Sequence, residues 1–131
     1  MHLTVPISPG EFLDKLTILE IKIERIVDPG KRENVRVERD LLAATWAASP
    51  LAAADVSALV AELKGVNEAL WEIEDNIRIK ESTATFDAEF VELARSVYHT
   101  NDRRAEIKRA INLALASDLI EEKSYANYRR G

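Results

Sequence analysis

The sequence predicts an all-α protein made of two antiparallel helical hairpins, arranged like a four-helix bundle, within one domain that spans residues 1–131. Apolar residues recur at alternating spacings of three and four along several stretches of the chain, which is the repeat of one helix face. Only 4 glycines and 4 prolines interrupt the 131 residues, so long helices can form. Hydrophobic residues make up 47% and charged residues 31%, a balance typical of globular domains rather than disordered chains.

The first helix is expected over residues 9–27, and its beginning carries the sharpest local signal. Ser8 can accept a hydrogen bond from the backbone N–H of Glu11, and the Glu11 carboxylate can reach back to the N–H of Ser8. Pro9 suits the first helical position, where its missing N–H costs nothing. Asp28 with the Pro-Gly that follows ends this helix and caps the next. Apolar residues occupy nearly every side of this helix, so neighbours should cover nearly all of it.

Two further helices are expected over residues 29–48 and from Asp55, as N-cap, to residue 81. The earlier one has a single narrow apolar stripe, which predicts a covering helix with one solvated face. The later one has an unbroken seam at heptad spacing, which predicts close pairing with another helix. The members of this seam are Val56, Leu59, Leu63, Val66, Leu70, Ile73 and Ile77.

The fourth helix is expected over residues 86–116, with the same spacing but a polar interruption in the middle of its seam. Asn101, Arg104 and Lys108 stand at the interrupted positions. Ser117 and Asp118 can cap a short final helix, and the remaining residues to 131 are expected to form a docked tail.

A polar cluster is expected halfway along the hairpin of the third and fourth helices. If the turn centres near residue 84, Asn67 faces Asn101 and Glu74 lies near Arg95. The candidate ligand-binding residues of both helices are Asn67, Trp71, Glu74, Arg78, Arg95, Tyr98, Asn101, Arg104, Lys108 and Asn112.

This cluster has two interpretations. In the first, Glu74 and Arg95 form an ordinary interhelical ion pair, and the asparagines fix helix register as a buried asparagine does in coiled coils. In the second, the cluster holds a small phosphorylated or carboxylated metabolite, because it has more Arg, Lys and Asn donors than register requires. An open pocket would favour the second interpretation, and a closed core the first.

The residue content excludes several kinds of chemistry. With 0 Cys there is no disulfide, thiolate zinc site or cysteine nucleophile. The 2 histidines are too few for a histidine-based site, and Ser8 is better explained as a cap than as a nucleophile. Glu72 and Asp75 match the E-x-x-D half of the Mg²⁺ motif of all-helical nucleotide pyrophosphohydrolases, but the E-E-x-x-E half is missing. We therefore predict no catalytic residue, no cofactor and no metal.

Charge and hydropathy indicate the surroundings of the protein. The net charge of −5 argues against a nucleic-acid partner. No stretch approaches the roughly 20 apolar residues of a membrane span, and the beginning of the chain lacks the pattern of a signal peptide. We expect a cytoplasmic protein without a membrane partner. Residues 51–92 carry 3 Lys and Arg against 10 Asp and Glu, whereas residues 93–131 carry 8 against 5, which favours antiparallel pairing of the last two long helices.

Four segments, taken in order, carry a resemblance that covers nearly the whole chain. They are Val5-Pro6-Ile7-Ser8-Pro9-Gly10-Glu11, Asp14-Lys15-Leu16-Thr17-Ile18-Leu19-Glu20, Leu70-Trp71-Glu72-Ile73-Glu74-Asp75 and Val97-Tyr98-His99-Thr100-Asn101-Asp102-Arg103-Arg104. With them the chain resembles a family of short, uncharacterised bacterial proteins, a domain of unknown function. The resemblance implies a bacterial cytoplasmic protein and brings no catalytic residue with it.

Two functions from different classes remain. The first is a non-catalytic helical assembly or adaptor module, and the uncovered seam of the long hairpin makes a homodimer its simplest form. The second is an enzyme or binding protein for a small anionic metabolite in the cluster between the third and fourth helices. The sequence leaves open whether the protein is an enzyme.

Overall fold

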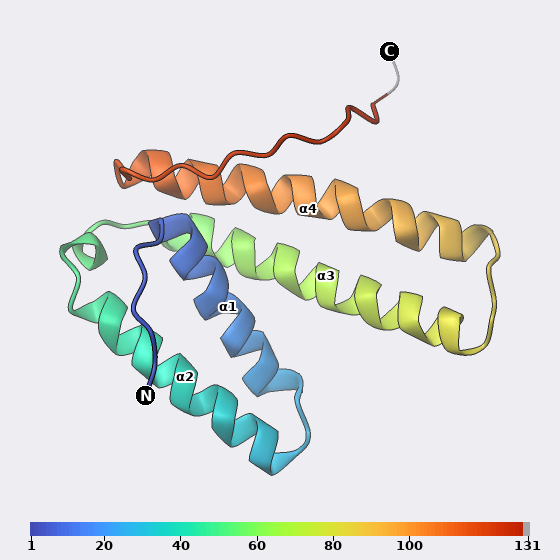
Figure 1. Cartoon of the computed structure of the whole chain (residues 1–131), viewed down its shortest axis with the longest axis horizontal. Coiled ribbons are helices and arrows are strands. Elements are labelled where there is room, and N and C mark those ends of the chain that lie inside the picture. The colour runs from blue at the N-terminus through green and yellow to red at the C-terminus, as the bar shows by residue number, and fades with distance from the viewer. Residues whose placement is uncertain (130–131) are drawn as a thin grey trace.

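The computed structural model describes residues 1–129, which contain four α-helices, one short 3₁₀-helix and no strand (Figure 1). The elements are α1 (Pro9–Arg25), α2 (Pro29–Ala47), η1 (Pro50–Ala53), α3 (Ser57–Ser82) and α4 (Ala88–Ala114). The all-α class and the two antiparallel hairpins, α1–α2 and α3–α4, are confirmed. None of these helices has the combination of length and apolar character that crossing a lipid bilayer requires.

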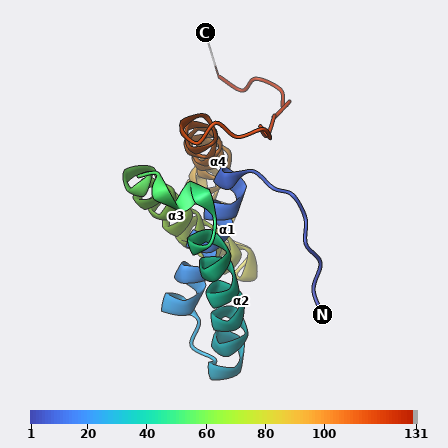
Figure 2. The same cartoon turned by 90° about the vertical axis from the view of Figure 1, so that its left-hand side faces the viewer.

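The two hairpins meet at one end and diverge towards their turns. Figure 1 shows α3 and α4 running side by side while the α1–α2 hairpin leans away from them. In the view of Figure 2, α1 lies between α2 and the α3–α4 pair. Helix α1 packs against all three of the other α-helices, whereas α2 packs against α1 and η1. The fold is therefore bundle-like where the hairpins meet, and α1 is its central helix.

The predicted caps of the first two helices form, with one correction. The Ser8 Oγ accepts from the Glu11 N–H at 3.2 Å, and the Asp28 Oδ2 accepts from the Lys31 N–H at 2.8 Å. The Glu11 carboxylate does not complete the predicted capping box, because it binds Lys108 instead, 2.6 Å from its Nζ. A charged partner from α4 thus takes the place of a local backbone donor.

Helix α1 ends at Arg25, two residues earlier than predicted, and the beginning of α3 and both ends of α4 also differ from the prediction. Val56, not Asp55, is the N-cap of α3, although the Asp55 Oδ1 accepts from the Ser57 N–H at 3.1 Å. Helix α4 begins later than predicted, because the Asp87 Oδ1 caps it by accepting from the Phe90 N–H at 2.9 Å. It also ends earlier, since Ala116 adopts a φ of 50°.

The end of α4 explains why no final helix follows. The N–H of Ser117 binds the Asn112 carbonyl at 2.9 Å and the N–H of Ala116 binds that of Leu113 at 3.3 Å, the two bonds of a Schellman motif. The predicted short helix after Ser117 is therefore wrong. The predicted tail forms, and it takes in the residues of the expected short helix as well: it runs back along α4 in Figure 1. Residues 130 and 131 of the predicted tail lie outside the described range.

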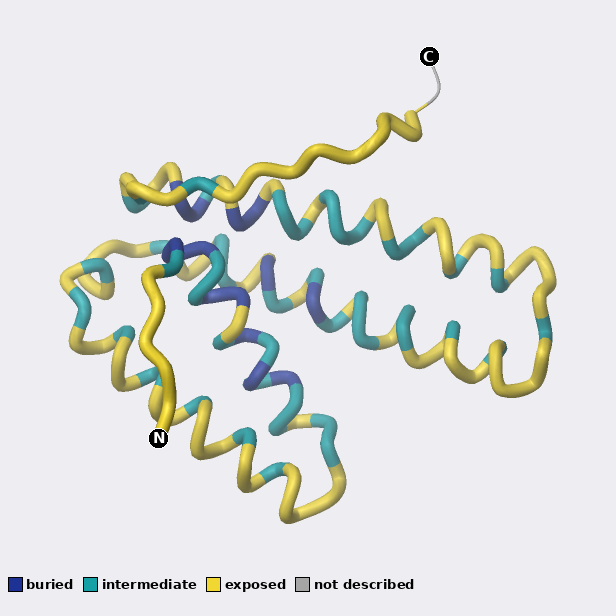
Figure 3. The backbone as a smooth tube through the Cα atoms, viewed as in Figure 1, coloured by how far each residue is buried: buried dark blue, intermediate teal, exposed yellow. Residues whose placement is uncertain are grey.

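The apolar core sits where the hairpins meet. Its central cluster is Leu13 of α1, Leu63 of α3, and Ile107 and Ile111 of α4. Ile107 was not part of the predicted seam. No residue from 68 to 106 is buried. Figure 3 shows exposed and intermediate residues along the part of α3 and α4 that extends away from the α1–α2 hairpin. We call residues 73–100, which form this part, the distal hairpin.

Candidate functional site

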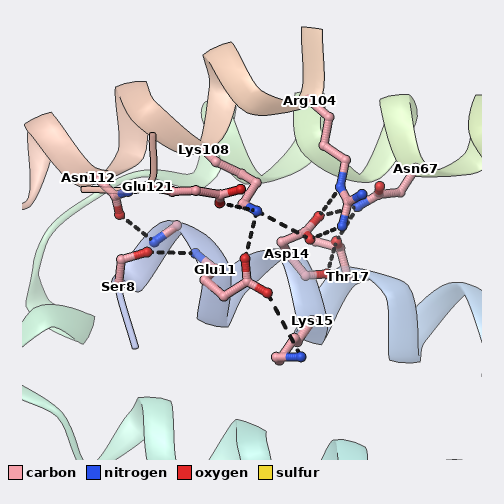
Figure 4. Close-up of polar contacts among 11 residues, drawn as sticks. Ser8, Glu11, Asp14, Lys15, Thr17, Asn67, Arg104, Lys108, Asn112 and Glu121 are labelled. Atoms are coloured by element: carbon pink, nitrogen blue, oxygen red, sulfur yellow. Dashed lines mark hydrogen bonds and ion pairs between the residues drawn. The ribbon is translucent and has the colours of Figure 1, made fainter. Parts of the chain in front are cut away.

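A buried carboxylate of α1 links three helices (Figure 4). Asp14 is only 1% exposed. Its two carboxylate oxygens accept from the guanidinium of Arg104 in α4, with Nε 2.9 Å from Oδ1 and Nη2 bonded to Oδ2. Asn67 of α3 donates from Nδ2 to the same Oδ1 at 2.8 Å. An ionised carboxylate is stable at this depth only with such charged and hydrogen-bonding partners.

Thr17, one turn further along α1, fixes the orientation of Asn67. The Thr17 hydroxyl donates to the Asp14 carbonyl at 2.8 Å and so accepts from the Asn67 Nδ2 at 3.0 Å. Both N–H bonds of the Asn67 amide are thereby used within the chain. Its Oδ1 must point away from Asp14, and it accepts no hydrogen bond from a described residue.

Lys108 forms a second charged link between α4 and α1. Its Nζ lies 2.6 Å from the Glu11 Oε2, 2.7 Å from the Glu121 Oε2 and 4.0 Å from the Asp14 Oδ2. Burial lowers the pKa of Lys108, but its hydrogen bonds with Glu11 and Glu121 outweigh burial and leave the pKa raised. The hydrogen bonds with Asp14 likewise raise the pKa of Arg104. Both cations therefore stay charged at neutral pH.

The first turn of α1 lies directly against α4. The backbone N–H of Gly10 donates to the Asn112 Oδ1 at 2.7 Å. A Cβ at position 10 would lie only 2.5 Å from the carbonyl oxygen of Lys108. Glycine is therefore needed here for close approach of the two helices.

An open cleft adjoins the buried network on the side where the hairpins diverge. We call it the fork cleft; its volume is about 490 Å³. Its walls are Ile18 and Ile21 of α1, Asn67, Leu70, Trp71, Glu74, Asp75 and Arg78 of α3, and Asn101 and Arg104 of α4. A smaller hollow of about 370 Å³ lies under the tail, where Tyr98 and Lys108 join Asn101 and Arg104.

The predicted cluster is thus only partly assembled. Six of its ten members line the fork cleft: Asn67, Trp71, Glu74, Arg78, Asn101 and Arg104. Tyr98 and Lys108 line the smaller hollow, and Asn112 is buried against Gly10 instead. The predicted pair of Glu74 with Arg95 is not formed, because Glu74 binds Arg78 at 2.6 Å and Arg95 binds Glu92 at 2.7 Å. Each of these pairs joins neighbouring turns of one helix, which needs no interhelical contact.

Sequence reasoning missed the α1 half of the polar network. Gly10, Asp14 and Thr17 are spaced by four and three, so they form one small and polar stripe on an otherwise apolar helix. That stripe was the available signal, and it faces the polar positions of α4. The polar positions of α3 and α4 instead predict partners within the α3–α4 hairpin.

All four cations of the predicted cluster are already paired within the chain. Arg78 and Arg95 have partners on their own helices, and Arg104 and Lys108 bind carboxylates of α1. An anionic ligand would have to displace one of these carboxylates. Within residues 1–129, no three His, Asp or Glu side chains lie close enough to hold a metal ion.

One comparison with known proteins identifies a family. The family model described as "Family of unknown function (DUF6165)" matches residues 3–129. No curated protein and no solved structure matches the chain. The resemblance found from the sequence motifs is confirmed: the chain belongs to DUF6165, a family of unknown function.

Proposed function

We propose that this member of DUF6165 is a non-catalytic helical assembly module that pairs with a second copy of itself through the distal hairpin. The observation that carries the proposal is the uncovered state of that hairpin. Helix α1 covers the other end of α3 and α4, and no residue from 68 to 106 is buried. The part of the α3 heptad seam that lies in this hairpin is therefore only partly covered by other helices.

The distal hairpin exposes large apolar side chains. Ile79 is 61% exposed, Phe86 59% and Val91 51%. Ile77 and Phe90 are half-buried. Full burial of such a side chain contributes about 1.5–3 kcal/mol, so covering several of them would stabilise a complex. A group of exposed apolar residues of this kind is typical of an interaction surface.

A second copy is the partner that lets the same apolar side chains cover one another across a twofold axis. Residues 51–92 have an excess of acids and residues 93–131 an excess of bases. In the part of the chain that the structure describes, Arg103 of α4 forms an ion pair with Glu62 of α3, away from the turn. The other ion pairs between these two helices join Lys80 to Asp87 and Glu89, next to the turn. Most of the bases in residues 93–131 lie outside the distal hairpin, which carries 6 acids against 3 bases, so an antiparallel twofold arrangement through it would depend on the apolar side chains.

The alternative function, binding of a small anionic metabolite, has weaker support. The fork cleft is open, as that function requires. Its two arginines, however, are held by Glu74 and by Asp14. The residues described here suggest no nucleophile or general base for an enzyme, which favours the assembly role.

Sedimentation velocity across a wide range of protein concentration tests the proposal. We expect a dimer for the wild type and a monomer for the double variant Ile79→Glu, Val91→Glu, because both side chains are already exposed and their replacement leaves the core intact. The matched control is Val37→Glu with Leu41→Glu on α2, which should remain dimeric. A wild type that is monomeric at every concentration would contradict the proposal, and so would a dimer that only the α2 variant dissociates.

We extend the proposal to a bacterial protein of the cytoplasm. Its support is the resemblance of the sequence motifs to a bacterial family. Fractionation of cells that make the protein tests this location, and recovery in the membrane or secreted fraction would contradict it.

A further inference from the structure

We infer that the fork cleft binds a small amine that carries a flat apolar body. This inference does not depend on dimer formation. It reverses the charge of the ligand that the sequence predicted, because among the described residues the charged side chain that lines the cleft without an ion-pair partner is an acid, Asp75, rather than a cation.

The size and walls of the cleft suit a small molecule. Its volume of about 490 Å³ lies in the range of about 300–1,000 Å³ that is typical of ligand pockets. Ile18 and Ile21 of α1 and Leu70 of α3 give it an apolar wall. Trp71 adds an aromatic ring, which packs against flat apolar groups and attracts cations to its face.

A nearly buried acceptor lines the same cleft. Asn67 is 6% exposed, and both N–H bonds of its amide are held by Asp14 and Thr17. The network therefore fixes which end of the amide is oxygen. No fully buried side-chain nitrogen or oxygen within residues 1–129 lacks a hydrogen-bond partner, so the Asn67 Oδ1 must be reachable from the cleft. An N–H group of a ligand is the complement of this oxygen.

The charges around the cleft favour a cation. Asp75 lines the cleft and forms no ion pair with a described residue. Glu74 is balanced by Arg78, and Arg104 by Asp14. The Asp75 carboxylate is thus the charge that remains for a ligand. It lies about 12 Å along α3 from Asn67, so it would attract at longer range a primary ammonium that binds the Asn67 oxygen and the ring of Trp71.

Fluorescence titration with three matched probes tests the inference. The chain has 2 tryptophans, so Trp46→Phe leaves Trp71 as the single reporter and keeps an aromatic ring against Phe12. The probes share a phenyl ring and differ in charge: phenethylamine, phenethyl alcohol and phenylacetate. We expect a saturable change with the amine, a weaker one with the alcohol and none with the anion. No saturable change with the amine, or tighter binding of phenylacetate, would overturn the inference.

A pair of variants locates the charge that is responsible. Asp75→Asn should weaken binding of the amine by about twofold to fivefold, as expected for one exposed charge pair, and leave binding of the alcohol unchanged. Glu38→Gln on α2 removes the same charge away from the cleft and should change neither affinity. Equal effects of the two variants would show nonspecific attraction and overturn the inference. In ¹H–¹⁵N spectra, the amine should also shift the Asn67 side-chain amide; an unmoved amide would argue against this site.

Discussion

Removal of the Asp14 carboxylate should destabilise the fold more than loss of any exposed ion pair. Asp14→Leu removes a group that is 1% exposed and accepts hydrogen bonds from Arg104 and Asn67. Loss of one partner from a buried pair costs about 3–5 kcal/mol, because the other charge stays behind unpaired. The Arg104 side chain is 29% exposed and keeps some hydration, so we expect about 3 kcal/mol.

The reverse substitution should cost less. After Arg104→Met, Asp14 keeps its hydrogen bond with Asn67 and its proximity to Lys108, whose Nζ is 4.0 Å away. We expect a loss of about 2 kcal/mol. The double variant removes both charges together, so its loss should not exceed that of Asp14→Leu alone. The two losses should therefore be non-additive by about 2 kcal/mol.

Urea unfolding followed by far-UV circular dichroism measures these losses, with the slope m checked for constancy. Arg95→Met is the matched control on the same helix, because Arg95 pairs with Glu92 at the surface, where the two side chains are 51% and 67% exposed, and its midpoint should not move. A loss below about 1 kcal/mol for Asp14→Leu would refute the reasoning. So would additive losses in the double variant, since they would show that Asp14 and Arg104 are not coupled.

Three more substitutions test the packing, each by urea unfolding. Gly10→Ala should cost about 1–3 kcal/mol, because its Cβ would lie 2.5 Å from the backbone oxygen of Lys108; an unchanged midpoint would show that α1 can shift freely. Ala116→Gly should gain up to about 1 kcal/mol by relieving a φ of 50°, and a loss would contradict the Schellman assignment. Leu63→Ala, at 0% exposure, should cost about 2–5 kcal/mol, whereas Leu70→Ala should cost less than half as much because Leu70 borders the fork cleft; equal losses would place both in the core.

The positions of the helices could be predicted because their signals are local. Ser8 and Asp28 each cap a backbone N–H three residues away, so no other part of the chain is needed. Alternating apolar spacing likewise follows from the geometry of one helix. The end of α4 was misjudged because its signal is an alanine with positive φ, where sequence rules lead one to expect glycine.

The candidate site could be predicted only in part. The polar stripes of α3 and α4 were recognised, and six of their members do line one cleft. Counting positions across the α3–α4 turn predicts partners within that hairpin, whereas Arg104 and Lys108 bind carboxylates of α1. The true partners come from α1. Asp14 lies 90 residues from Arg104 in the sequence, and Glu11 lies 97 residues from Lys108.

The sequence by itself determined the helices, their order and the presence of polar stripes on two of them, α3 and α4. Caps and helix faces depend on residues within a few positions of each other, which any chain with this sequence shares whatever its tertiary structure. Only the tertiary structure decided that α1 packs against both α3 and α4, that Asp14 binds Arg104 and that the hairpins diverge to leave a cleft. These features depend on the angle at which packed helices cross, which is set by side chains from all of them together.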